Sequence, residues 1–284
     1  MTAFFETHSA EWDDLYTQDG LRAEVFRARQ ARVLEWIDAL PLARGSRVLD
    51  VGSGAGHMTV ALAERGFEVV AIDPSESMRE RTRLRVEQSG QAGNVTFQDA
   101  DVQALPFIDE EFDLVVALGI LPWVPSPELA IQEMSRVLQP DGHIVVTADN
   151  SWRLTFVVDP LLTPAYTWPR RKLMGLFADR KQHPATHESD SCAIQTNHNI
   201  PFINRLLRST LTNVRTATIG FGPFTLFGRT AFADDRGLAV HRRLQTLADR
   251  GSPLFRFAGT HYLVLARKRR RARTGSESRE GALR

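Results

Sequence analysis

The chain alternates short apolar runs with longer segments in which apolar residues recur every three or four positions. Short apolar runs between turn residues are typical of buried strands, and the wider spacing is typical of helices. The runs predict strands at residues 46–51, 67–73, 94–100, 112–120 and 143–149. The spaced segments predict helices at residues 21–40, 58–64, 127–138 and around 78–84. This alternation indicates a doubly wound α/β fold.

The alternation stops after residue 149. Residues 150–200 contain four prolines between 160 and 184 and only fragments of periodicity, and residues 222–258 predict a second irregular or helical insertion. Between and after them, the pattern predicts a helix at about 200–211 and strands at 213–220 and 261–268. We therefore expect a mostly parallel, seven-stranded, Rossmann-like sheet with late cap insertions.

The composition is ordinary for a soluble globular protein, with 43% hydrophobic and 24% charged residues among 284. We find no run of 18 apolar residues, so we expect no transmembrane helix. The start MTAFFETHSAEWDD lacks the basic and apolar stretches of a signal peptide, which favours a cytoplasmic location. Cys192 is the one cysteine, so neither an intrachain disulfide nor a cysteine-based metal site can form.

The net charge of +1 is unevenly distributed along the chain, because the last residues form a basic tail. Residues 267–284 carry a net charge of +6, which leaves about −5 for the rest of the chain. A mildly acidic body argues against a broad nucleic-acid footprint, because such footprints need basic surface. The tail is expected to be a solvated, disordered end, with contact to phosphate or an anionic membrane as the alternative.

A glycine-rich turn follows the first predicted strand. Residues 50–56 read Asp-Val-Gly-Ser-Gly-Ala-Gly, and glycines allow a tight turn that brings backbone close to a ligand. Open α/β sheets bind ligands at this end of their strands. The G-x-G-x-G spacing departs from the dinucleotide fingerprint G-x-G-x-x-G, because His57 stands where its last glycine would be. A nicotinamide-dependent oxidoreductase would therefore need an altered loop.

Four segments in order carry a family resemblance. They are VLDVGSGAG (48–56), VVAIDPSESM (69–78), DVQALPFIDEEFDLVV (101–116) and EMSRVLQPDGHIVVT (133–147). Residues 46–147 thereby resemble a class I S-adenosylmethionine (SAM)-dependent methyltransferase, in particular the group that contains ubiquinone/menaquinone-type and other small-molecule enzymes. The strand HYLVLARK (261–268) is similar to the last strand of that family. The resemblance implies SAM as the cofactor.

The resemblance also implies roles for residues at the first two strand ends. Asp50 would organise the loop around the SAM ammonium group, and Gly52, Gly54 and Gly56 would let backbone approach the methionyl and ribose parts. Asp73 would accept hydrogen bonds from both ribose hydroxyls, a use natural to a carboxylate. For Asp73 the alternative is a helix N-cap, which the following proline also suits. For Asp50 structural roles stay open.

The remaining cofactor residues come from later motifs. Met78 would pack on the adenine, Asp101 would accept its amino group, and the Val102 N–H would meet a ring nitrogen, where the family often has alanine. Leu118 would line the site near the methyl-bearing sulfur. A solvated loop acid is the alternative for Asp101. His57 is expected in the first turn of a helix, facing cofactor or core.

No catalytic residue is assigned. Methyl transfer from a sulfonium is an in-line displacement, so positioning and desolvation can supply much of the catalysis. A hydroxyl acceptor would profit from a base such as histidine. The candidates are His183, His187, His198 and His261, each with a surface or structural role as the alternative. No metal site is expected, because Pro184 interrupts the one helical histidine pair.

Aromatic residues are frequent in the second half of the chain. They can line a pocket for a large apolar or planar acceptor, or pack the cap on the sheet. Two apolar stretches, residues 154–162 and 221–228, with Arg170, Arg171 and Lys172 nearby, also permit transient contact with a membrane surface. The aromatic residues are Trp152, Phe156, Tyr166, Trp168, Phe177, Phe221, Phe224 and Phe227.

The sequence therefore predicts a SAM-dependent methyltransferase that acts on a small acceptor, lipophilic or aromatic. The alternatives are an RNA methyltransferase and a non-catalytic SAM-binding protein, since cofactor motifs report binding alone. No nucleic-acid partner is expected, and the oligomeric state stays open. The expected parts are an N-terminal helical segment over the cofactor site (1–45), a SAM-binding core (46–150), cap insertions with a returning helix and strand (151–258), the last strand (259–268) and the basic tail (269–284).

Overall fold

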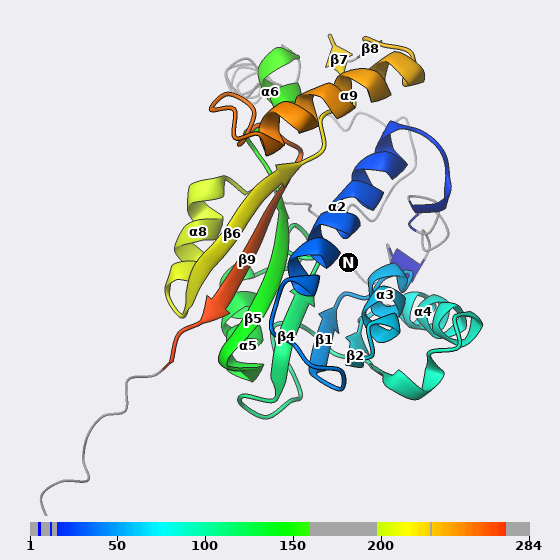
Figure 1. Cartoon of the computed structure of the whole chain (residues 1–284), viewed down its shortest axis with the longest axis vertical. Helices are drawn as coiled ribbons and strands as arrows, with labels where there is room; N and C mark the ends of the chain where they lie inside the picture. Colours follow the sequence, from blue (N-terminus) through cyan, green and yellow to red (C-terminus); the bar gives the residue numbers. More distant parts are fainter. Residues whose placement is uncertain (1–4, 7–11, 13–15, 160–197, 228, 271–284) are drawn as a thin grey trace, which may run out of the picture.

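The computed structural model describes residues 5–6, 12, 16–159, 198–227 and 229–270. Its centre is a seven-stranded sheet in the order β3-β2-β1-β4-β5-β9-β6, in which β9 runs antiparallel to both of its neighbours (Figure 1). The predicted Rossmann-like sheet is confirmed. The strands are β1 (Arg47–Val51), β2 (Glu68–Ile72), β3 (Val95–Gln98), β4 (Phe112–Ala117), β5 (Leu138–Asp149), β6 (Leu211–Ile219) and β9 (His261–Lys268).

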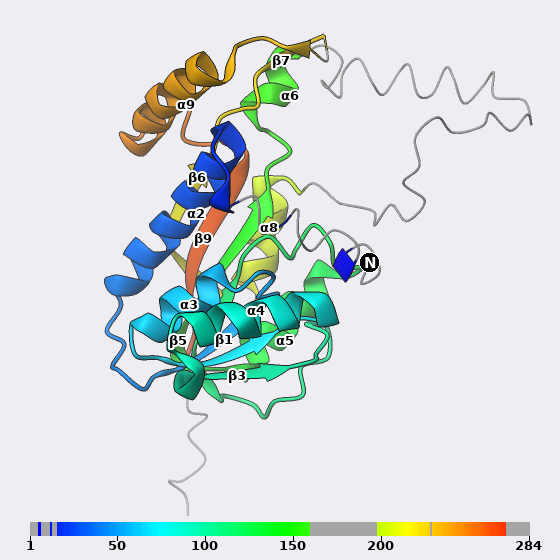
Figure 2. The same cartoon turned by 90° about the vertical axis from the view of Figure 1, so that its right-hand side faces the viewer.

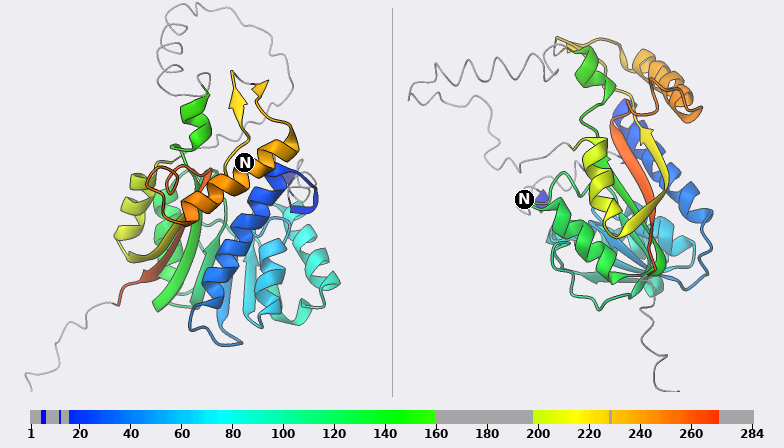
Figure 3. Two further views of the ribbon diagram at one scale, coloured as in Figure 1. Left: turned by 45° about the horizontal axis from the view of Figure 1, so that its top comes forward. Right: turned by 90° about the vertical axis from the view of Figure 1, so that its left-hand side faces the viewer.

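Helices cover both faces of the sheet, which explains why the central strands are nearly continuous apolar runs (Figures 2 and 3). One face packs against α2 (Leu21–Asp38), α3 (His57–Glu64) and α4 (Glu76–Gln88). The other face packs against α5 (Pro127–Val137) and α8 (Ile200–Arg208). A short 3₁₀ turn, η1 (Ala92–Asn94), leads into β3.

Two helices and a two-stranded ribbon gather beyond the end of the sheet at which β5 stops and β9 starts (Figure 1). They are α6 (Leu154–Val158), α9 (Asp234–Asp249) and the two-stranded ribbon of β7 (Thr225–Leu226) and β8 (Arg229–Thr230). An ion pair between Arg32 and Asp249, 3.0 Å long, ties α9 to α2. These elements stand where the sequence predicts cap insertions.

Two strand boundaries differ from the sequence pattern by more than two residues. The apolar run predicts a strand at 112–120, whereas β4 ends at Ala117, because Gly119 has a φ of 80° that no regular strand allows. β5 begins at Leu138, five residues before the strand predicted at 143–149, because Leu138 pairs with Phe112. The pairing then shifts register before Leu114, and Asp141 takes a φ of 65°.

The strand order positions the site. The chain runs outward from β1 to β3 and then returns to β4 beside β1, so the order reverses between β1 and β4. Ligands of open α/β sheets bind at such a reversal, outside the carboxyl ends of the strands. Among the residues that the structure describes, we find no helix long and apolar enough to cross a membrane.

Candidate active site

Hydrogen bonds join the glycine turn after β1 to the end of β2. The N–H groups of Gly52 and Ser53 both donate to the Ile72 carbonyl, at 2.8 and 3.0 Å. The next N–H, of Gly54, donates to Asp73 Oδ2 at 3.0 Å. Gly52 and Gly54 have φ values of 68° and 56°, in the left-handed region that favours glycine. The turn therefore presents backbone, without side chains at these two positions, to the space above the sheet.

The second carboxylate oxygen of Asp73 shows which residue caps the following helix. Asp73 Oδ1 accepts from the Ser75 N–H at 2.9 Å, and Ser75 Oγ in turn accepts from the Met78 N–H. Ser75 is therefore the N-cap of α4, and Asp73 stands before it. Burial raises the pKa of Asp73, and its bonds from Ser75 and Gly54 oppose that shift.

Gly56 has a different surrounding from the other two glycines. A Cβ at this position would lie 2.9 Å from the Cα of Thr82 in α4, and Gly56 is absent from the cavity wall described below. Its φ of 83° and the close approach of α4 explain the glycine. The structure thus gives Gly56 a helix-packing role of its own, and its place beside the cofactor stays a prediction.

Asp50 is buried beneath the turn. It is 2% exposed, and its Oδ2 accepts a 2.6 Å hydrogen bond from Thr59 Oγ1. Burial and, less strongly, the charge of Asp73 raise the pKa of Asp50 to about 7, against the bond from Thr59. A carboxyl that titrates near neutrality beside a cavity is a candidate binding group for a cation.

A cavity of about 980 Å³ opens over the carboxyl ends of the strands. Eight of the nine residues predicted to bind SAM line it, which brings the motifs of β1, β2, β4 and the loop after β3 together. We call this part of the wall the cofactor half. Its predicted members are Asp50, Gly52, Gly54, Asp73, Met78, Asp101, Val102 and Leu118.

The members from later motifs differ in burial. Met78 and Val102 are buried, whereas Asp101 is exposed. Asp101 Oδ1 accepts from the Gln103 N–H at 2.9 Å, which fixes the carboxylate at the start of its loop. Leu118 follows β4 directly, at the strand end nearest the order reversal.

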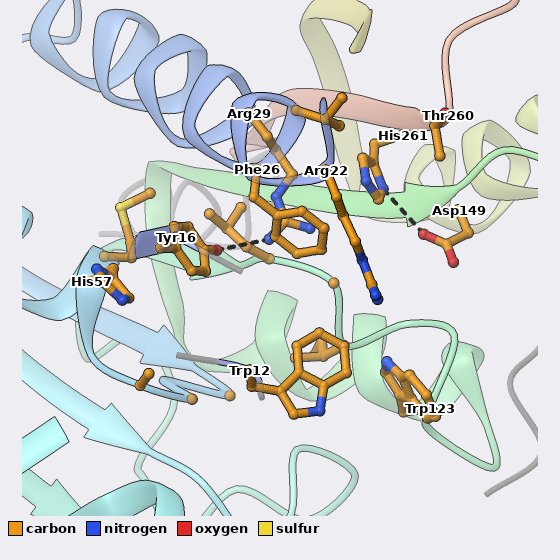
Figure 4. Close-up of a pocket in the computed structure, with 18 of the residues that line it drawn as sticks. Trp12, Tyr16, Arg22, Phe26, Arg29, His57, Trp123, Asp149, Thr260 and His261 are labelled. Carbon is orange, nitrogen blue, oxygen red and sulfur yellow. Dashed lines mark hydrogen bonds and ion pairs between the residues drawn. The ribbon is translucent and has the colours of Figure 1, made fainter. Parts of the chain in front are cut away.

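Aromatic side chains line the other part of the wall, which we call the aromatic half (Figure 4). Tyr16 stacks on His57 with ring centroids 4.3 Å apart, and it meets Phe26 of α2 edge to face. Trp12 and Trp123 meet edge to face at 6.1 Å. The residues of this half are Phe5, Trp12, Tyr16, Phe26, Trp123, Phe224 and Phe232, with the polar Arg22, Arg29, Asp149, Arg153 and His261 among them.

Two polar contacts cross the aromatic half. Arg29 is buried, stacks its guanidinium over the Phe26 ring at 4.5 Å and donates from Nη2 to the Tyr16 hydroxyl at 2.9 Å. His261, the first residue of β9, lies 3.1 Å from Asp149, the last residue of β5, measured from Nδ1 to Oδ1. Figure 4 shows both contacts facing the same space as Trp123.

The histidine candidates separate in the structure. His261 lines the cavity, whereas His198 stacks on Phe202 away from its wall. His57 faces the cavity, one of the two expected orientations. His183 and His187 lie outside the described residues, as do Cys192 and the tail from residue 271.

The aromatic residues expected to line a pocket from the second half of the chain contribute little. Phe224 is the one of them on the wall among the described residues. Phe221 is buried against Phe255, and Trp152 and Phe227 are exposed. Phe156 lies under the Arg153 guanidinium. Tyr166, Trp168 and Phe177, with the basic residues 170–172, are outside the described residues.

The sequence predicted an N-terminal helical segment over the cofactor site, but it identified none of the residues that this segment and α2 contribute to the cavity wall. The apolar spacing of residues 21–40 marks a helix face, but Arg29 is buried on that helix and carries no apolar signal. Asp149 had a usable signal, because it follows an apolar strand just as Asp73 does. That signal alone would not have identified His261 as its partner.

The cofactor half fits SAM in its chemistry. A Cβ on Gly54 would meet nothing closer than 3.9 Å, so this turn leaves room for a ligand at its backbone. Asp73 offers a carboxylate to hydroxyl donors, and Asp50 offers one to a cationic group. We expect these residues to hold the ribose and the methionyl ammonium, with Met78 and Asp101 at the adenine.

Comparisons with known proteins agree with this geometry. A family model described as "Methyltransferase domain" matches residues 49–146. An uncharacterized protein of Mycobacterium tuberculosis is 35% identical over 189 residues, which cover 61% of this chain and 65% of that protein. The ubiquinone/menaquinone biosynthesis C-methyltransferase of Yersinia enterocolitica is 39% identical over 114 residues, 39% of this chain and 45% of the enzyme.

A solved structure extends the likeness to nearly the whole fold. The magnesium protoporphyrin IX methyltransferase of Synechocystis, with bound SAH, has a TM-score of 0.62 at 17% identity, and the match covers 94% of this chain and 97% of that chain. That identity supports the fold alone. The chain spans just under two thirds of the mycobacterial relative and less than half of the Yersinia enzyme. The methyltransferase domain predicted from the motifs is confirmed.

The raised pKa of Asp50 generates a prediction about pH. SAM binding should favour the ionised carboxylate, so below pH 7 each binding event must release a proton. We expect the SAM affinity to fall about 10-fold per pH unit between pH 7 and 5.5. The ligand ammonium keeps its charge in this window, below an ordinary α-amino pKa of about 7.7–8.0. Isothermal titration calorimetry measures the affinity.

Two variants sharpen this measurement. Asp50→Asn should abolish the pH dependence, and Thr59→Val should move it to higher pH, because the Thr59 hydrogen bond lowers the pKa of Asp50. An affinity that stays constant from pH 5.5 to 7.5 in the wild-type protein would contradict the role of Asp50.

Proposed function

We propose that this chain, which carries a class I SAM-dependent methyltransferase domain at residues 49–146 with SAM as its cofactor, methylates a small lipophilic or aromatic acceptor. The observation that carries the proposal is the continuity of one cavity from the cofactor half to the aromatic half. Its volume of about 980 Å³ lies at the upper end of the range for small-molecule sites, roughly 300–1,000 Å³. Such a volume suits a cofactor and a small acceptor held side by side.

The residues would act by positioning. Bound SAM supplies an activated methyl group on a sulfonium. Asp73 and Asp50 would fix its ribose and methionyl ends, and Leu118 would exclude water beside the reacting centre. Because the leaving group is good, correct orientation in a dry cavity accounts for much of the rate.

The aromatic half supports the acceptor class. Trp12, Phe26 and Trp123 offer ring faces and edges to a planar or apolar molecule, and Arg22 reaches from α2 toward the two tryptophans (Figure 4). The name of the Yersinia relative refers to the biosynthesis of ubiquinone and menaquinone, which are small molecules. Both observations favour a small-molecule acceptor over RNA.

Transient membrane contact would supply a lipophilic acceptor. Val157 and Val158 of α6 are exposed, as are Leu226 of β7 and Phe227 directly after it. They lie near the cavity residue Pro223, whose carbonyl accepts from Thr155 Oγ1 at 3.3 Å. Flotation with anionic liposomes at low salt should carry the protein upward, and Val157→Ser with Phe227→Ser should reduce it. If the protein does not float with the liposomes, supply of the acceptor through membrane contact is contradicted.

Cofactor binding tests the function directly. We expect calorimetry to show SAM bound far more tightly than NAD, and Asp73→Ala to weaken SAM binding about 10- to 100-fold. That range corresponds to the roughly 1.5–3 kcal/mol of a hydrogen bond to a charged group. Asp99→Ala is the matched control, because Asp99 follows the neighbouring strand β3 but lies off the cavity wall.

Turnover completes the test. SAH formation with apolar and aromatic acceptors, and not with bulk RNA, is the expected result. Unchanged SAM affinity in Asp73→Ala would overturn the cofactor assignment. Salt-sensitive methylation of RNA would favour the RNA methyltransferase, and SAM binding without any turnover would favour a non-catalytic binder.

A further inference from the structure

A carboxylate and an imidazole form a buried pair at one end of the aromatic half. Asp149 and His261 are register partners at the end of β5 and the start of β9, and each side chain belongs to a residue that is 8% exposed. The 3.1 Å contact joins Asp149 Oδ1 to His261 Nδ1. Both residues line the cavity.

This contact fixes the imidazole orientation. A carboxylate accepts only, so Nδ1 carries the proton and Nε2 is left with its lone pair. Within the described part of the chain, Nε2 has no hydrogen-bond partner in the protein. It is also not fully buried, so a ligand can reach it. The Phe26 ring holds the imidazole edge to face at 5.6 Å. The ring therefore presents a basic nitrogen to the cavity.

The charges around the pair keep it in this form. Burial lowers the pKa of His261, and the charges of Arg29 in α2 and Arg153 before α6 lower it further. The bond to Asp149 acts in the opposite direction. Burial alone would raise the pKa of Asp149. The bond to His261 and the charges of the two arginines have the larger effect, so the pKa of Asp149 is lowered. At neutral pH the imidazole is therefore neutral and the carboxylate ionised.

The pair also lies next to the strand end at which the methyl group is expected. The Gly119 N–H, one residue after Leu118, donates to Thr147 Oγ1 at 2.7 Å. Thr147 precedes Asp149 by two residues on β5, so both side chains point to the same face of the sheet. A Cβ on Gly119 would approach Arg29 Nη1 at 3.2 Å, which places that cation beside the same strand end.

We propose that His261 is the general base of the methyl transfer, that Asp149 positions it, and that the acceptor carries a hydroxyl group. This inference rests on the proposed function. His261 Nε2 takes the hydroxyl proton while the acceptor oxygen bonds to the methyl carbon. The carbon–sulfur bond breaks and its electron pair stays on sulfur, which leaves neutral SAH and an ether. The proton on the imidazole then passes to solvent.

The arginines favour the same acceptor. A hydroxyl that loses its proton develops negative charge on oxygen, and a nearby guanidinium stabilises that charge in a dry site. Arg29 Nε is buried without a hydrogen-bond partner among the described residues, so its guanidinium is not fully satisfied by the protein. An amine acceptor would develop no such negative charge.

Histidine NMR tests the inference without turnover. In the complex with SAH, ¹⁵N shifts should show His261 protonated on Nδ1 and titrating below pH 6.5, with the signal assigned by its loss in His261→Asn. His241 is the internal control, because it is also buried, has a lowered pKa and lies off the cavity wall. Its Nδ1 accepts from the Phe221 N–H, so it should show the opposite tautomer.

Asp149→Asn should lower the pKa of His261 further, because the ionised partner is lost. A proton on Nε2, or a His261 still charged at pH 7, would overturn the inference. Calorimetry with SAH separates this failure from that of the proposed function, since the wild-type protein, His261→Asn and His241→Asn should bind SAH within about two-fold of one another. Weak or absent SAH binding in the wild type would instead refute the cofactor assignment.

Turnover supplies the second measurement, with 1-naphthol and 1-naphthylamine as planar probes that share a ring system. With SAM and 1-naphthol, His261→Asn should lower kcat roughly 100-fold or more with little change in KM, and it should remove the rise of the rate with pH. His241→Asn should stay near wild type. Equal losses in the two variants, or faster methylation of the amine than of the naphthol, would overturn the inference. The NMR result decides it if neither probe is methylated.

Discussion

The cofactor half of the cavity depends on the Asp73 carboxylate. One oxygen accepts from Gly54 in the turn after β1, and the other accepts from Ser75 at the start of α4. These two bonds fix two loops at one point and repay part of the cost of burying a charge. From α4, Thr82 Oγ1 and Arg85 Nε donate to the Gly54 and Ala55 carbonyls, at 2.8 and 2.7 Å. The turn is therefore preorganised before any ligand binds.

The two halves of the cavity come from different parts of the chain. The cofactor half is built by consecutive strand ends between residues 50 and 118, with hydrogen bonds that stay within this segment. The aromatic half joins the N-terminal segment and α2 to β9 and the chain around β7 and β8, with Trp123 after β4 and Asp149 at the end of β5. Phe26 and His261 contact each other in it although they lie near opposite ends of the sequence. Acceptor preference can thus change through the two ends of the chain while the cofactor turn stays the same.

The sequence predicted which residues gather at the cofactor half because the signals for them are local. The apolar runs mark β1 and β2, and the residues that end them, Asp50 and Asp73, meet because parallel strands end at the same edge. Gly56 shows the limit of a local motif. Its spacing matched the other glycines, but the neighbour that requires it, Thr82, lies on another helix.

The aromatic half could not be predicted in the same way. The Asp149–His261 pair depends on the antiparallel register of β5 and β9, and the two residues are 112 positions apart in the sequence, with α8, β6 and α9 between them. The burial of Arg29 depends on how α2 is rotated against the sheet, and an apolar pattern cannot specify that for a charged residue. Both are tertiary contacts, so they can be identified only once the packing of strands and helices is known.

A crystal structure of the protein with SAH and 1-naphthol is the most direct measurement of the central claim, that one cavity holds cofactor and acceptor with a base between its halves. The account predicts ribose hydroxyls on Asp73, the adenine beside Met78 and Asp101, and the sulfur facing Leu118 with the naphthol oxygen near His261 Nε2. An SAH molecule lying among Trp12, Phe26 and Trp123, with Asp73 contacting no ligand atom, would contradict it.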